Sequence, residues 1–126
     1  MPNSKRKGKR GELEWCHKCR EHGFEARRGQ QFSGNPDSPD VIVEGLDSLH
    51  FEIKLQNRMQ LYDWMDQALR DCGLRTPVVA HRKDNAEWLV TMRADAWFDL
   101  VREALGPEGP ELEYREKETG QGKNDG

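Results

Sequence analysis

The sequence predicts a mixed α/β fold, in which a central mixed β-sheet is flanked by helices. Segments with helical periodicity alternate along the chain with short β-rich segments, an order typical of such folds. Two neighbouring β-rich segments are separated by a short turn, which predicts an antiparallel hairpin within the sheet. The length of 126 residues allows one domain with one modest core and leaves no room for a second of normal size.

Three segments have the periodicity of an amphipathic helix. In the first, residues 9–22, apolar side chains recur at three-residue spacing, and Gly23 follows as a C-terminal cap. The second begins at residue 61, has apolar side chains at i, i+3, i+4, i+7 and i+8, and closes at Cys72-Gly73. The third covers residues 94–105 and is broken by the following GPEGP.

The β-rich segments are short and are bounded by turn-forming residues. They cover residues 24–28, 40–44, 49–56, 77–81 and 88–92. The segments DVIVE and LHFEIKLQ are separated only by GLDS, so we expect them to pair as a hairpin. The stretch GQQFSGNPDSP before them is rich in turn residues and is predicted to be a loop.

The charge of the chain is unevenly distributed. The formal net charge is −3, yet the first ten residues carry five positive charges and no negative one. The segment beyond Gly106 is rich in Gly and Glu and lacks apolar periodicity. We therefore predict a disordered basic arm at 1–8, one domain at 9–105 and a disordered acidic tail at 106–126. The arm is compatible with DNA binding and equally typical of a solvated segment.

The composition argues against several classes of protein. No apolar run approaches the ~18 residues that a membrane span needs, and no apolar segment follows the basic N-terminus as in a signal peptide. The cysteines, Cys16, Cys19 and Cys72, are odd in number, which does not favour a disulfide framework. We therefore expect reduced thiols in a cytoplasmic protein.

The alternating segment 49–56 carries the residues that could perform chemistry. Residues two apart in a strand point to the same side, so Glu52 and Lys54 share a face while the apolar residues between them join the core. Asp40, across the hairpin, could bring a second carboxylate near Glu52. Mg²⁺ relieves the repulsion between two such carboxylates. Lys54 could orient or help to deprotonate a water molecule at the ion, or stabilise a charged phosphate, as phosphodiester hydrolysis requires.

Simpler interpretations of these residues exist. Glu-x-Lys on a strand is also the pattern of an exposed ion pair on the wet face of a sheet. His50 shares the face of Glu52 and could contact DNA or solvent, and His81 is expected at the end of a strand. Neither histidine has an identifiable partner for a catalytic triad.

The pair Cys16-His17-x-Cys19 raises the hypothesis of a zinc-stabilised module, with His22 and Cys72 as further ligands. Zinc sites usually combine two ligand pairs at recognisable spacing, and only one is present. Cys16 and Cys19 also fall on the apolar side of the first helix. Packing of that helix is therefore the favoured interpretation.

The aromatic side chains are interpreted mainly as core. Trp64, Trp88, Trp97 and Phe98 fall in phase with apolar neighbours, which favours burial over stacking on nucleic-acid bases. Trp15 on the first helix is left open, because an exposed Trp15 would suit a dimer or DNA contact.

The order of the motifs resembles that of a known superfamily. Pro39-Asp40 followed by Glu52-Ile53-Lys54 is similar to the PD-(D/E)XK nuclease signature. The opening KGKRGELE resembles the archaeal Holliday-junction-resolvase branch, in which a glycine is followed four residues later by a catalytic glutamate. Gly8 then places this glutamate at Glu12. The chain also resembles small phage-encoded nucleases that carry a similar Tyr-Asp-Trp-Met helix.

Over roughly residues 5–103, this resemblance implies a restriction-endonuclease-like core with a metal-dependent site. Asp40 and Glu52 would bind Mg²⁺, with Mn²⁺ able to substitute. The backbone carbonyl of Ile53 would be a third ligand, and Lys54 would be the catalytic lysine.

The resemblance also adds residues from other elements to the catalytic set. Glu12, on the first helix, would reach the metal directly or through water. Ser33 lies in a Ser-Gly pair ahead of the aspartate, where the resolvase branch carries a mobile loop. Gln67 stands where related nucleases often have a helix glutamine near the site.

The implied activity is that of a DNA endonuclease of bacterial or phage origin. Its favoured form is a homodimeric Holliday junction resolvase, whose two sites cut opposed strands of a four-way junction. A small domain with a basic arm favours recognition of DNA shape over base sequence. A nicking or restriction-like endonuclease and a catalytically idle nucleic-acid-binding module are the alternatives. The candidate phosphate contacts are Lys9, Arg10, Arg27, Arg28 and Arg82.

Overall fold

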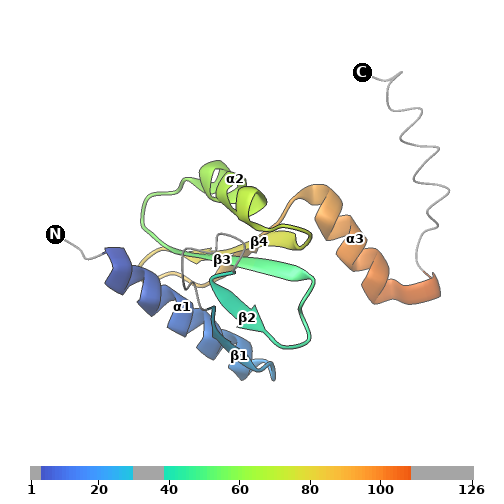
Figure 1. Cartoon of the computed structure of the whole chain (residues 1–126), viewed down its shortest axis with the longest axis horizontal. Coiled ribbons are helices and arrows are strands. Elements are labelled where there is room, and N and C mark those ends of the chain that lie inside the picture. Colours follow the sequence, from blue (N-terminus) through green and yellow to red (C-terminus); the bar gives the residue numbers. More distant parts are fainter. Residues whose placement is uncertain (1–3, 30–38, 109–126) are drawn as a thin grey trace, which may run out of the picture. The chain divides into compact units, whose positions relative to one another are not determined.

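The computed structural model describes residues 4–29 and 39–108, and this part of the chain contains a five-stranded sheet and three α-helices (Figure 1). Their order along the chain is the predicted one. The elements are α1 (Ser4–Glu21), β1 (Ala26–Arg28), β2 (Val41–Val43), β3 (Leu49–Leu55), α2 (Leu61–Asp71), β4 (Thr76–Arg82), β5 (Leu89–Thr91), α3 (Ala94–Leu105) and the 3₁₀ turn η2 (Gly106–Glu108).

The sheet is mixed, as predicted, with the strands in sequence order β1-β2-β3-β4-β5. Strand β2 pairs antiparallel with β3, and Val41 lies opposite Phe51, so the predicted hairpin is confirmed. Strands β3 and β4 are parallel over their whole length, from Leu49 opposite Thr76 to Leu55 opposite Arg82. A parallel pair needs a crossover, which α2 provides. The other neighbouring strands pair antiparallel.

Helix α1 covers one face of the sheet. Trp15, Cys16 and Cys19 of α1 belong to a buried cluster with Phe51 and Ile53 of β3. The ring centroid of Trp15 lies 5.9 Å from that of Phe51, so Trp15 is a core residue. Burial, and then the neighbouring Cys16, raise the pKa of the Cys19 thiol to about 11. A protonated, buried thiol packs as an apolar group and is a poor zinc ligand, which supports the packing interpretation.

Helix α2 covers the opposite face. Its Trp64, Met65 and Ala68 are buried with Val79 of β4 in a second cluster. Val79 lies opposite Glu52 in the register of β3 and β4 and shares its side of the sheet. The side that carries Glu52 is therefore covered by a helix, and the interpretation of Glu52 as half of an exposed surface ion pair is wrong.

The C-terminal helix lies in a separate compact unit, residues 94–126, whereas we predicted it within the domain 9–105. None of its residues is buried. Trp97 is 49% exposed and Phe98 is 56% exposed, so the prediction that they are core residues is wrong. Helical periodicity reports that one side of a helix is apolar but does not say what covers that side. The predicted acidic tail begins as the η2 turn, and its residues 109–126 lie outside the described part.

The N-terminal segment differs from its prediction. Helix α1 begins at Ser4, so residues 4–8 are helical where we predicted a disordered arm. Lys and Arg are good helix formers, which lets the anchored helix extend backwards through this basic stretch. Among the described residues, no helix is long and apolar enough to cross a membrane.

The close approach of α1 to β3 depends on Gly11. A Cβ at Gly11 would lie 3.2 Å from Cβ of Leu55 and 3.5 Å from Cγ2 of Ile53, whereas a Cβ at Gly8 would have no neighbour within 4 Å. Both glycines lie within α1. The contact at Gly11 brings the next residue, Glu12, up to the edge of β3.

We expect Gly11→Ala to destabilise the protein by about 1–3 kcal/mol relative to Gly8→Ala, because the rigid central strand cannot yield to the added methyl group. Gly8→Ala is the matched control and should be neutral or stabilising by up to about 1 kcal/mol, since Ala favours helix over Gly. Urea unfolding of both variants measures the difference. Equal stabilities would contradict the packing described here.

Candidate active site

The residues predicted to perform chemistry line one open pocket of about 560 Å³ in the unit Met1–Arg93. Glu12 comes from α1, Asp40 from the residue before β2, and Gln67 from α2. Glu52 and Lys54 come from β3 in the middle of the sheet. The structure thus brings together five of the six residues in the predicted catalytic set. The sixth, Ser33, lies outside the described residues.

Asp40 is held by backbone contacts on two sides. The N–H of Ile53 donates a hydrogen bond of 2.9 Å to Oδ2 of Asp40, and the N–H of Asp40 donates to the carbonyl oxygen of Phe51 at 3.0 Å. On the other side, the N–H of Gly29 donates to the carbonyl oxygen of Asp40 at 2.8 Å. A Cβ at Gly29 would overlap the carbonyl oxygen of Pro39, so this approach needs glycine. The carboxylate therefore has a fixed position beside β3.

The electrostatic surroundings of Asp40 disfavour its negative charge. Burial is the largest cause, followed by the charge of Glu52, and together with a smaller effect of Glu12 they raise the pKa of Asp40 to about 7. The hydrogen bond from Ile53 and the charge of Lys54 act in the opposite direction without compensating. A site that concentrates negative charge in this way favours a bound cation.

Glu52 is 4% exposed and lies between two nitrogen-bearing side chains of its own strand. Nε2 of His50 is 3.7 Å from Oε1 of Glu52, and Nζ of Lys54 is 3.7 Å from Oε2. His50 is wholly buried, and neither of its ring nitrogens has a hydrogen-bond partner among the residues that the structure describes. Leaving a buried polar group unpaired costs about 1–3 kcal/mol of folding free energy, so His50 destabilises the core.

Lys54 is held in place by Gln67. Its Nζ donates a hydrogen bond of 3.0 Å to Oε1 of Gln67, which comes from the helix that covers this face of the sheet. The ammonium group thus has a fixed neighbour on one side and Glu52 on the other. The placement agrees with the predicted nearness of Gln67 to the site.

Glu12 contacts an arginine in the structure. Nε of Arg28, in β1, donates a hydrogen bond of 2.8 Å to Oε1 of Glu12. Arg28 was predicted to contact phosphate, and its guanidinium group is here engaged by a carboxylate at the edge of the pocket. Whether Glu12 assists metal binding stays a prediction.

The residues of the pocket fit a divalent cation of the magnesium type. Among the described residues, no group of three or more His, Cys, Asp or Glu side chains could hold a metal ion by themselves. Mg²⁺ needs fewer protein ligands, because it keeps several waters and is commonly held by one or two carboxylates. Asp40 and Glu52, with the backbone carbonyl of Ile53, form a donor set of that kind. The shared position of these groups in one pocket supports this fit, as does the raised pKa of Asp40, which is due first to burial and then to the charge of Glu52.

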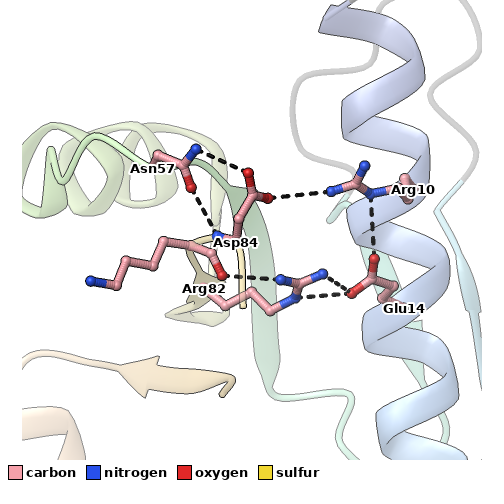
Figure 2. A network of polar contacts seen from close by, with 6 residues as sticks. Arg10, Glu14, Asn57, Arg82 and Asp84 are labelled. Atoms are coloured by element: carbon pink, nitrogen blue, oxygen red, sulfur yellow. Dashed lines mark hydrogen bonds and ion pairs between the residues drawn. The ribbon is translucent and has the colours of Figure 1, made fainter. Parts of the chain in front are cut away.

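Two of the residues predicted to contact phosphate belong to a polar network at the end of β4 (Figure 2). Arg82 donates to Oε1 of Glu14 from both Nε, at 3.0 Å, and Nη2, at 2.6 Å. Nε of Arg10 lies 3.4 Å from Oε2 of Glu14, and Nη2 of Arg10 lies 3.7 Å from Oδ1 of Asp84. The network ties α1 to the end of β4. Arg10 remains more than half exposed, whereas the side chain of Arg82 is 16% exposed.

The same network reaches the pocket through Asn57. Nδ2 of Asn57 donates to Oδ2 of Asp84 at 3.0 Å, and the N–H of Asp84 donates to Oδ1 of Asn57 at 2.8 Å (Figure 2). Asn57 lines the pocket and is the second residue after β3. The segment after the Glu-x-Lys strand is therefore fixed at the rim of the pocket.

Sequence analysis did not identify Asn57 or Arg58 as site residues, although both line the pocket. Arg58 is exposed, and no ion pair engages it in the described part of the chain. Its position three residues after the strand with the predicted catalytic lysine is a signal that could have identified it. Of the predicted phosphate contacts, Lys9 and Arg27 are likewise exposed.

The fold is similar to that of a solved resolvase. No family model and no curated protein matches the chain. Among solved structures, the chain is similar to Hjc, a Holliday junction resolvase from the archaeal hyperthermophile Archaeoglobus fulgidus. The two chains have a TM-score of 0.50 and 26% sequence identity, over 68% of this chain and 72% of the resolvase chain. This match confirms the restriction-endonuclease-like fold, supports the PD-(D/E)XK superfamily and suggests a nuclease.

The raised pKa of Asp40 predicts how stability depends on pH in EDTA. Below about pH 4 the carboxyl group is protonated in both folded and unfolded chains, whereas between its ordinary pKa of 3.8 and about 7 only the folded chain keeps the proton. The free energy of unfolding therefore falls as the pH rises from about 4 towards 7, because only the unfolded chain releases this proton. We expect Asp40→Asn to raise the free energy of unfolding by about 2 kcal/mol at pH 8, with the gain vanishing towards pH 4.

Thermal unfolding of both proteins across this pH range measures the effect. Asp66→Asn, which removes an exposed carboxylate of α2, is the matched control and should show no such trend. An Asp40→Asn variant less stable than the original protein at pH 8 would contradict the described electrostatics.

Proposed function

We propose that this protein is a divalent-metal-dependent endonuclease that hydrolyses phosphodiester bonds in DNA. The observation that carries the proposal is the convergence of Asp40, Glu52 and Lys54 in one pocket. The two carboxylates are acceptors for a hard cation, and the ammonium group is the donor that a phosphate needs. The likeness to a solved resolvase supports nuclease chemistry for a chain of this fold.

In this proposal, Asp40 and Glu52 bind Mg²⁺ together with the carbonyl oxygen of Ile53, and Mn²⁺ can replace it. When bound, the cation supplies Lewis-acid stabilisation of the charge that develops on the phosphate and helps to activate the attacking water. The hydrogen bond from the Ile53 amide of β3 fixes the carboxylate of Asp40, so little reorganisation is needed when it binds the cation.

Lys54 supplies a second positive charge to the reacting phosphate in this mechanism. Its hydrogen bond to Gln67 holds Nζ in the pocket, where Nζ also forms an ion pair with Oε2 of Glu52 at 3.7 Å. Gln67 is thus a positioning residue for the catalytic lysine. Glu12 contributes at the edge of the site, directly or through water, once the contact with Arg28 adjusts to the substrate. Ser33 remains part of the proposed set on the strength of the sequence motif alone.

We propose branched DNA, in particular a four-way junction, as the substrate. Support comes from the solved neighbour, which is a Holliday junction resolvase. The open pocket and the exposed Lys9, Arg27 and Arg58 suit contact with phosphates more than with base edges. Two symmetric cuts require two sites, so the proposal includes a homodimer.

We expect the protein to nick a labelled four-way junction in Mg²⁺ at symmetric positions, to leave matched linear duplex intact, and to cut neither substrate in EDTA. Glu52→Ala and Lys54→Ala should each lower the rate by about 10²–10³-fold or more, because each removes charge stabilisation that the transition state needs. Gel analysis of single-turnover reactions measures these rates.

Glu44→Ala, which alters an exposed carboxylate directly after β2, is the control and should cut as well as the original protein. Equal cutting of junction and duplex would retain the endonuclease and refute junction selectivity. Full activity of Glu52→Ala would refute the site, and no cutting by folded protein in Mg²⁺ or Mn²⁺ would favour an idle DNA-binding module.

The position of Arg58 predicts a role in binding more than in chemistry. Each phosphate contact releases counterions, so Arg58→Ala should weaken DNA binding and reduce the slope of log affinity against log salt by about one. Fluorescence anisotropy titrations in Ca²⁺ at several salt concentrations measure both. Arg70→Ala removes an exposed charge of α2 outside the pocket lining and is the control. An unchanged salt slope for Arg58→Ala would contradict the assignment.

A further inference from the structure

His50 is a buried residue that the proposed reaction does not use. It lies on β3 two residues before Glu52, so both side chains point to the side of the sheet that α2 covers. The side chain is wholly buried, and both ring nitrogens are without hydrogen-bond partners. An imidazole ring always carries at least one N–H donor, so an apolar residue would fill this position without stranding a polar group.

The nearest charged group to His50 explains why a histidine is useful here. Nε2 lies 3.7 Å from Oε1 of Glu52, just beyond hydrogen-bond distance. Asp40 and Lys54 already have hydrogen-bond partners: the N–H of Ile53 donates to Asp40, and Gln67 accepts from Lys54. Oε1 of Glu52 faces His50, whereas Oε2 faces Lys54. The carboxylate of Glu52 is thus the site group whose orientation His50 can control.

We propose that His50 is a positioning residue for metal binding: as a neutral imidazole protonated on Nε2, it donates a hydrogen bond to Oε1 of Glu52 and leaves Oε2 available to the cation. This inference rests on the proposed function, because it assigns Glu52 as a ligand. Partners that hold metal-ligating side chains in this way typically contribute 10–100-fold to metal affinity. The small shift needed to close the contact from 3.7 Å stays within the motion of a glutamate side chain.

The test compares three variants by Mn²⁺ binding without DNA, using the electron paramagnetic resonance signal of free Mn²⁺. His50→Phe keeps the size and removes the donor, and it should weaken binding by about 10–100-fold. His50→Gln restores a donor at nearly the reach of Nε2 and should bind within about threefold of the original protein.

His81→Phe is the matched control. His81 is also a buried histidine, on β4, but its Nε2 contacts Oγ1 of Thr91 at 2.9 Å. Loss of that contact should leave Mn²⁺ affinity unchanged. Circular dichroism and thermal unfolding establish that each variant is folded before its affinity is compared.

A second measurement uses the original protein and does not depend on variant folding. Long-range ¹H–¹⁵N correlation spectra of the imidazole rings distinguish Nε2–H from Nδ1–H tautomers. We expect His50 to be protonated on Nε2 alone and its Nε2 resonance to shift on Mg²⁺ addition, while that of exposed His22 does not. A proton on Nδ1 with bare Nε2 would overturn the proposal.

The outcomes separate this inference from the proposed function. If the original protein binds Mn²⁺ and cuts DNA while His50→Phe binds Mn²⁺ equally well, the role of His50 is refuted and the nuclease stands. If the original protein neither binds Mn²⁺ nor cuts DNA, both proposals are refuted. Weak binding by His50→Phe with recovery in His50→Gln supports a hydrogen bond and excludes a purely structural role.

Discussion

The central position of β3 is the constraint on which the candidate site depends. The strand has β2 on one side and β4 on the other, and helices cover both of its faces. Phe51 and Ile53 anchor it in the cluster under α1, which forces the alternate residue Glu52 towards α2. A carboxylate is thereby placed in a nearly dry position, where its charge acts strongly on its neighbours. Asp40 feels that charge because the hairpin holds it against the Ile53 amide.

Tight packing and unfavourable electrostatics are therefore combined in one region. Gly11 permits the close approach of α1 to β3, and Gly29 permits that of the chain after β1 to the backbone of Pro39 and Asp40. The raised pKa of Asp40 and the unpartnered ring of His50 are costs at the same place. Buried polar groups with unmet interactions cluster where a protein binds something that satisfies them. These unfavourable features favour a cation site over an idle nucleic-acid-binding module, since an idle module has no physical reason to keep them.

The network of Arg10, Glu14, Arg82, Asp84 and Asn57 shows how the rim of the pocket is stabilised without apolar packing. It joins α1, the end of β4 and the segment after β3, which are distant in sequence (Figure 2). Two nitrogens of Arg82 donate to one oxygen of Glu14, and several linked pairs hold a segment better than an isolated surface pair does. Arg58 follows Asn57, which this network holds, and lines the same pocket.

Sequence alone determined the elements, the β2–β3 hairpin and the pocket residues Asp40, Glu52 and Lys54, because periodicity, turn chemistry and motif spacing are local properties. Only the tertiary structure decided which surfaces are covered. Glu52 and His50 are buried under α2. Arg82 contacts Glu14, and Trp97 and Phe98 are exposed. The tertiary structure also added Asn57 and Arg58 to the pocket. An alternating or helical pattern states which side chains share a face, but burial and partnership depend on chain segments far away in sequence, which no local pattern contains.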